Sequence, residues 1–152
     1  MKILVAVDSS NYADEVLEEI AGRIWAKDTE FYLLTAIEPC HNWSHEQEFL
    51  HEGRIILDQR INFLKKRLPY NEITGQVVEG KAASAIVKTA SERTCHLIII
   101  GSHGDTGKRM AGIGSVAAAV VNAAPCSVEV VKLFEASARK LSSSATAEKA
   151  LK

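Results

Sequence analysis

The sequence has few cysteines and little net charge. Its three cysteines, Cys40, Cys95 and Cys126, form an odd and scattered set. Such a set argues against a disulfide framework and is typical of proteins in the reducing cytoplasm. The 18 basic and 19 acidic side chains leave a formal net charge of -1, so the chain lacks the basic field that nucleic-acid binding needs. We therefore expect a cytoplasmic protein with no nucleic-acid partner.

Long apolar runs are also missing. None approaches the roughly 18 residues of a membrane-spanning helix. The apolar run at the amino terminus, Ile3–Val7, is interrupted by Asp8 and is too short for the hydrophobic region of a signal peptide. We expect no membrane association. A chain of 152 residues without internal repeats has the size of one domain.

Five short apolar runs are present, and several are nearly continuous in valine, isoleucine and leucine. Continuous runs are typical of strands that are buried on both faces, as in a parallel sheet. The runs are Ile3–Val7, Phe31–Ile37, Ile73–Val78, Leu97–Ile100 and Val128–Val131.

Apolar residues at helical spacing lie between these runs. The four helical patterns cover 13–24, 50–68, 82–90 and 116–123. Regular alternation of strands and helices predicts right-handed crossovers and an α/β fold with a doubly wound sheet. Two segments break the alternation: a polar loop expected over Glu38–His45, and Gly101–Ser115.

The segment Gly101–Ser115 contains five glycines in fifteen residues. Glycine lets a ligand approach the backbone closely, and backbone N–H groups at the start of a helix bind anions. The segment therefore predicts a phosphate site. Ser115 has two interpretations: it is the N-cap of the fourth helix, or its hydroxyl binds a phosphate.

Two common phosphate motifs do not fit this segment. A P-loop needs glycine at the place of Ser102 and serine or threonine at the place of Arg109. The stretch Gly112–Ala117 has the letters of a relaxed dinucleotide motif, but it does not directly follow a strand.

A third pattern fits better. Gly101, Gly104, Gly114 and Ser115 have the spacing G-x2-G-x9-G-[ST]. This spacing resembles that of the ATP-binding branch of the universal stress protein family. The resemblance extends over Met1–Val131, because the first strand with its terminal aspartate and the entry to the last strand also look like the family's.

The resemblance implies a five-stranded parallel sheet in the order 3-2-1-4-5, with a nucleotide at its switch point. Ala6, Val7 and Asp8 would line the nucleoside pocket, with the Asp8 carboxylate on the ribose. Ala36 would contact the adenine edge through its backbone, and Gly101 would pack under the ribose. From the sequence alone, Asp8 has a second interpretation as a cap of the first helix.

The same resemblance implies a phosphate site. Gly104, Gly114, Ser115 and Val116 would hold the phosphates of ATP, with or without Mg²⁺. His103 lies between two of the glycines, and it either donates to a phosphate or packs against the loop.

The resemblance further implies a homodimer through the last strand, Ser127–Val131. We expect a nucleotide-binding domain over 1–133 and, from a composition rich in alanine, serine and lysine, a polar tail over 134–152. The expected function is that of an ATP-binding stress-response regulator. Two alternatives stay open: a slow ATPase or self-phosphorylating protein, and a ligand-free dimeric interaction protein of the same fold.

Enzymatic and metal sites find little support in the residues. No serine, histidine and aspartate or cysteine and histidine arrangement has a credible chain context, so we expect no catalytic residue. Cys40, His41, His45 and His51 match no standard zinc spacing, so we expect no metal ligands among them.

Overall fold

A parallel sheet of five strands forms the centre of the fold. A computed structural model describes residues 1–39, 43–103 and 112–132, with the backbone alone at 43–46. The strands have the order β3-β2-β1-β4-β5, which confirms the predicted fold class. They are β1 (Lys2–Ala6), β2 (Glu30–Ile37), β3 (Glu72–Glu79), β4 (Leu97–Gly101) and β5 (Ser127–Val131).

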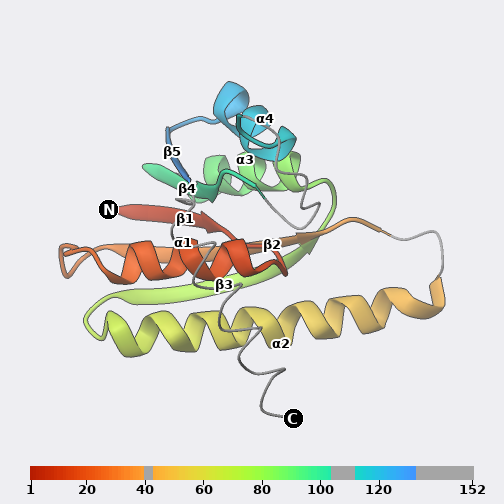
Figure 1. The fold of residues 1–152 in the computed structure, drawn as a ribbon, viewed down its shortest axis with the longest axis horizontal. Coiled ribbons are helices and arrows are strands. Elements are labelled where there is room, and N and C mark those ends of the chain that lie inside the picture. The colour runs from red at the N-terminus through yellow and green to blue at the C-terminus, as the bar shows by residue number, and fades with distance from the viewer. Residues whose placement is uncertain (40–42, 104–111, 133–152) are drawn as a thin grey trace, which may run out of the picture.

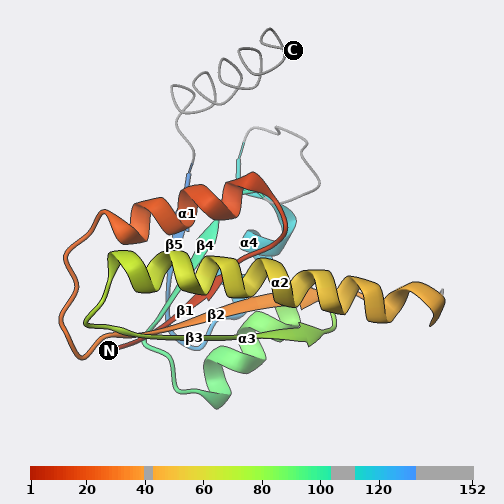
Figure 2. The same cartoon turned by 90° about the horizontal axis from the view of Figure 1, so that it is seen from below.

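Helices cover both faces of this sheet (Figure 1). They are α1 (Asn11–Ala21), α2 (Trp43–Arg67), α3 (Ala82–Glu92) and α4 (Ser115–Ala123). Buried residues of α1 and α2 share one core cluster, and those of α3 and α4 share the other. Figure 2 shows α1 and α2 together in front of the strands. The structure is therefore a three-layer α/β sandwich.

The continuous apolar runs are explained by burial from two sides. In β1, Ile3 and Val5 belong to the core cluster of α1 and α2, whereas Leu4 between them belongs to the cluster of α3 and α4. Successive side chains of a strand point to opposite faces, so a central strand covered by helices on both faces needs apolar residues at every position.

The polar loop expected over Glu38–His45 is shorter than predicted. Helix α2 begins at Trp43 and runs to Arg67, two turns before the apolar pattern that begins at Leu50. The prediction was wrong at this end because apolar spacing detects only the part of a helix that packs on a core. The first turns of α2 carry mostly polar residues and give no such pattern.

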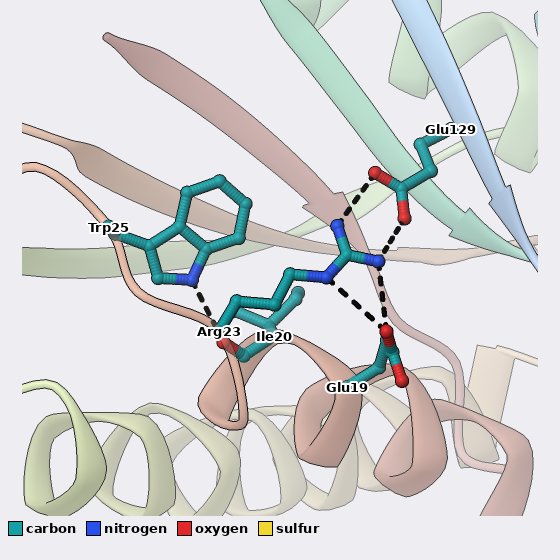
Figure 3. Close-up of polar contacts among 5 residues, drawn as sticks. All are labelled: Glu19, Ile20, Arg23, Trp25 and Glu129. Carbon is teal, nitrogen blue, oxygen red and sulfur yellow. Dashed lines mark hydrogen bonds and ion pairs between the residues drawn. The ribbon is translucent and has the colours of Figure 1, made fainter.

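An ion pair ties the edge strand β5 to the end of α1 (Figure 3). The Arg23 guanidinium donates to both carboxylate oxygens of Glu129, at 2.9 and 2.5 Å, and Nη2 also donates to Glu19 at 3.1 Å. Hydrogen bonding from Arg23 holds the pKa of Glu129 below its ordinary value. The acidic side chain of the edge strand thus has its partner within the same chain.

None of the helices in the described part of the chain is both long and apolar enough to cross a membrane.

Candidate functional site

A cavity of about 280 Å³ opens at the carboxyl ends of the strands. Strand β1 pairs with β2 on one side and with β4 on the other, so the chain winds away from β1 in both directions. Such a switch point leaves a crevice beyond the strand ends, where open α/β sheets bind their ligands. Residues that follow β1 and β4, together with the starts of α3 and α4, line the cavity.

The structure brings nine of the ten predicted site residues to this one cavity. They come from β1, β2, the end of β4 and the start of α4, and they are Ala6, Val7, Asp8, Ala36, Gly101, His103, Gly114, Ser115 and Val116. The tenth, Gly104, lies outside the described residues. The fold thus brings predicted site residues from four separate segments of the sequence to one cavity.

The start of α4 presents backbone N–H groups to the cavity. The first intrahelical hydrogen bond runs from the Ala118 N–H to the Gly114 carbonyl at 2.9 Å. The N–H groups of Ser115, Val116 and Ala117 precede that bond and have no acceptor within the helix. All three residues line the cavity, so the positive end of the α4 dipole faces it.

Gly114, and not Ser115, is the N-cap of α4, and no side chain makes a capping hydrogen bond there. The interpretation of Ser115 as the cap was therefore wrong. Ser115 is the first residue of the helix and is exposed. This placement leaves the helix start open to an anion instead of closing it with the chain's own oxygen.

Gly114 is needed for space and not for its backbone conformation, because its φ is -65°. A Cβ at this position would lie 3.1 Å from the carbonyl oxygen of Ser102, which already accepts the Gly114 N–H at 2.7 Å. A Cβ on Gly101 would similarly lie 3.2 Å from the His103 carbonyl oxygen. Both glycines thus let the loop after β4 pack closely against its own backbone.

The loop after β4 is anchored at Ser102. Its N–H donates to the Val131 carbonyl at 2.8 Å, and its side chain contacts His103 Nδ1 at 3.0 Å. Ser102 is buried, with 4% of its surface exposed. The loop start is therefore fixed to the end of β5, and this anchoring places His103 on the cavity wall.

Asp8 forms a local turn with Ser10. Asp8 Oδ1 accepts the Ser10 N–H at 3.0 Å and the Ser10 hydroxyl at 2.5 Å. The N-cap of α1 is Ser10, so Asp8 is not the helix cap that its sequence position also allowed. Asp8, which follows β1, lines the same cavity as the start of α4.

Sequence reasoning missed Arg60, a buried residue of α2 that contacts this turn. Its side chain donates to the carbonyls of Asp8 and Ser10 and to the Asp14 carboxylate. The sequence did contain a sign that Arg60 is buried. Position 60 lies at helical spacing with Leu57, Ile61 and Leu64, on the buried face of α2. A charged residue on such a stripe needs a partner in the interior.

No group of three or more candidate metal ligands occurs among the described residues. Of the four residues considered for zinc, Cys40 and His41 lie outside the described part of the chain, and the side chain of His45 does as well.

Comparison with known proteins identifies this architecture. The model of the universal stress protein family matches residues 1–132. The chain belongs to the universal stress protein family. Universal stress protein A homolog 2 of Coxiella burnetii is 33% identical over 143 residues, which cover 87% of this chain and 94% of that protein.

Solved structures show the same fold. The hypothetical protein MJ0577 superposes with a TM-score of 0.74 at 28% identity, over 88% of this chain and 96% of that one. A universal stress protein from Archaeoglobus fulgidus, solved in complex with dAMP, superposes with a TM-score of 0.62 at 22% identity, over 87% and 98% of the two chains. This family member is one in which the fold holds an adenine nucleotide.

Proposed function

We propose that this stress protein binds ATP in the cavity between β1 and β4 and acts as a nucleotide-dependent regulator of the stress response. The observation that carries the proposal is that one cavity is lined both by a helix start without a side-chain cap and by an aspartate. The α4 N–H groups suit phosphates, whereas a carboxylate repels phosphates and suits the hydroxyl groups of a ribose. The two kinds of group thus match the two polar parts of a nucleotide, its phosphates and its ribose.

The residues that line the cavity suggest how the nucleotide is oriented in it. We assign the ribose to Asp8 with Gly101 beneath it, because both lie near the ends of the central strands β1 and β4. The base then points toward β2, where the backbone of Ala36 offers one N–H and one carbonyl. The apolar side chains of Leu34 and Ile86 line the same cavity and suit the faces of an adenine.

The phosphates extend from the ribose to the start of α4. Gly114, Ser115 and Val116 contact them there in our proposal, and His103 and Gly104 act from the loop before it. The glycine spacing over Gly101–Ser115 resembles that of the ATP-binding branch of the family, and this resemblance favours ATP over a monophosphate. Mg²⁺ would be carried with the phosphates, because we assign no set of protein ligands to it.

Thermal unfolding tests the proposal. At a concentration of 100 times its Kd, ATP should stabilise the fold by about 2.7 kcal/mol, which raises Tm by roughly 5–10 °C for a domain of this size. Inorganic tripolyphosphate is the matched control without a nucleoside and should give a much smaller shift. No shift with ATP, ADP or AMP would rule out the nucleotide site.

Chromatography of the same samples after several hours with Mg²⁺ separates binding from turnover. We expect ATP to stay intact and the protein to stay unphosphorylated. Release of ADP, or transfer of phosphate to the chain, would favour the slow ATPase or self-phosphorylating alternative.

We also propose that the protein forms a homodimer through β5. We further propose that its nucleotide-binding domain ends at position 133 and that the protein is cytoplasmic. In the described residues β5 pairs only with β4, and Glu129 is already paired with Arg23, so this edge lacks the unpaired charge that blocks strand pairing. Light scattering should give twice the mass of one chain, also for a variant that ends after Leu133. A monomer would contradict the dimer, and the location is tested by cell fractionation.

A further inference from the structure

Arg60 is the most deeply buried cation of the described chain whose role the proposed function leaves unexplained. Only 6% of its surface is exposed, although an arginine side chain is among the costliest to remove from water. A buried charge is retained where its hydrogen-bonding groups find partners. The identity of those partners therefore shows what the residue does.

The partners of Arg60 lie in the turn between β1 and α1. One terminal nitrogen donates to the Asp8 carbonyl, and the other donates to the Ser10 carbonyl at 3.0 Å. Nε donates to Asp14 Oδ1 at 3.1 Å, which is in the first turn of α1. A single planar guanidinium thus fixes two carbonyls of one turn and the start of the helix that follows it.

This turn has open space on two sides. Asp8 lines the proposed nucleotide cavity, whereas Ser9 and Arg60 line a second cavity of about 420 Å³ between α1 and α2. Within the turn Ser10 is buried, with 7% of its surface exposed. The hydrogen bonds from Arg60 to the Asp8 and Ser10 carbonyls hold the turn from a helix that is remote in sequence.

The turn in its present shape also sets the direction of the Asp8 carboxylate. Asp8 Oδ1 is held by the N–H and the hydroxyl of Ser10, at 3.0 and 2.5 Å, and the carbonyl of the same Ser10 is held by Arg60. A displacement of Ser10 would carry the carboxylate with it. We propose that Arg60 is a positioning residue that keeps Asp8 in the orientation that binds the ribose.

This inference rests on the proposed nucleotide site, and it links that site to α2. Arg60→Met keeps most of the apolar stem but removes all three hydrogen bonds. We expect it to weaken ATP binding roughly 10- to 100-fold, because small displacements of a positioning group have effects of this size. Arg60→Lys keeps the charge but lacks the planar fork, and we expect an intermediate loss.

A double-mutant cycle separates positioning from a general loss of stability. The affinities of wild type, Arg60→Met, Asp8→Ala and the double variant are measured by calorimetry with ATP. If Arg60 acts through Asp8, its replacement should change the affinity less than about twofold once Asp8 is alanine. A residue with a merely structural role would lower the affinity equally in both backgrounds. Arg54→Met, an exposed arginine of the same helix, is the matched control and should bind like wild type.

The outcomes are distinct. Wild-type affinity in a folded Arg60→Met variant would overturn this inference and leave the nucleotide site intact, as would an equal loss in both backgrounds. Failure of the wild-type protein to bind ATP would overturn the proposed function and this inference together. If Arg60→Met does not fold, the same cycle with Arg60→Lys decides, because that variant retains the buried charge and the side-chain stem.

Discussion

Replacement of Gly114 by valine should weaken ATP binding by about 100-fold or more while the protein stays folded. A Cβ at this position would lie 3.1 Å from the Ser102 carbonyl oxygen, so valine should push the loop after β4 away from the helix start where we place the phosphates. Hydrogen bonds to charged groups contribute about 1.5–3 kcal/mol each, so the loss of one or two of them lowers affinity by roughly this factor. Calorimetric titration with ATP measures the effect.

Ala119→Val is the matched control for this variant. It also introduces a valine, within α4 itself, but Ala119 is exposed and does not line the cavity. We expect it to bind ATP like wild type, and Gly114→Ala to fall between the two. An affinity of Gly114→Val within threefold of wild type would contradict the assignment of the phosphates to the α4 start.

Replacement of Phe31 by alanine should lower the free energy of unfolding by about 4 kcal/mol, a typical loss for a buried aromatic residue. Phe31 is 1% exposed, and its ring meets Trp25 edge to face, with the centroids 5.2 Å apart. Its register partner in β1 is Ile3, at the opposite end of that strand from the nucleotide cavity. The folded fraction should therefore still bind ATP.

Urea denaturation measures the stability change, and calorimetry on the folded variant measures the affinity. Tyr70→Ala is the control, because Tyr70 is 73% exposed and should lose less than about 1 kcal/mol. Equal losses in the two variants would contradict the location of the core between the sheet and α1 and α2. A loss of ATP affinity in folded Phe31→Ala would contradict the separation of core and site.

The sequence predicted the fold well where burial acts on every position. In β1, the unbroken run from Ile3 to Val7 indicated a strand covered on both faces, and the structure confirms this. It predicted less where burial is one-sided or absent. The start of α2 at Trp43 has mostly polar residues and therefore no apolar spacing, although backbone hydrogen bonding continues the helix.

For the candidate site, too, the sequence predicted some features and not others. Gly101 and Gly114 were found because a spacing of glycines along the chain is itself a signal. The role of Gly114 as the N-cap, with Ser115 inside the helix, was not evident, since serine is a common cap and the outcome depends on the path of the loop. Arg60 was missed because its partners, Asp8 and Ser10, lie 52 and 50 positions away, and only the packing of α2 on α1 brings them together.

The most direct test of the account is a crystal structure of this protein grown with ATP. We expect electron density for the nucleotide between β1 and β4. The ribose hydroxyls should lie within about 3.2 Å of the Asp8 carboxylate, and phosphate oxygens should lie within about 3.2 Å of the Ser115 and Val116 nitrogens. Density for ATP elsewhere on the molecule, or a nucleotide with its phosphates toward Ala36, would contradict the proposed site.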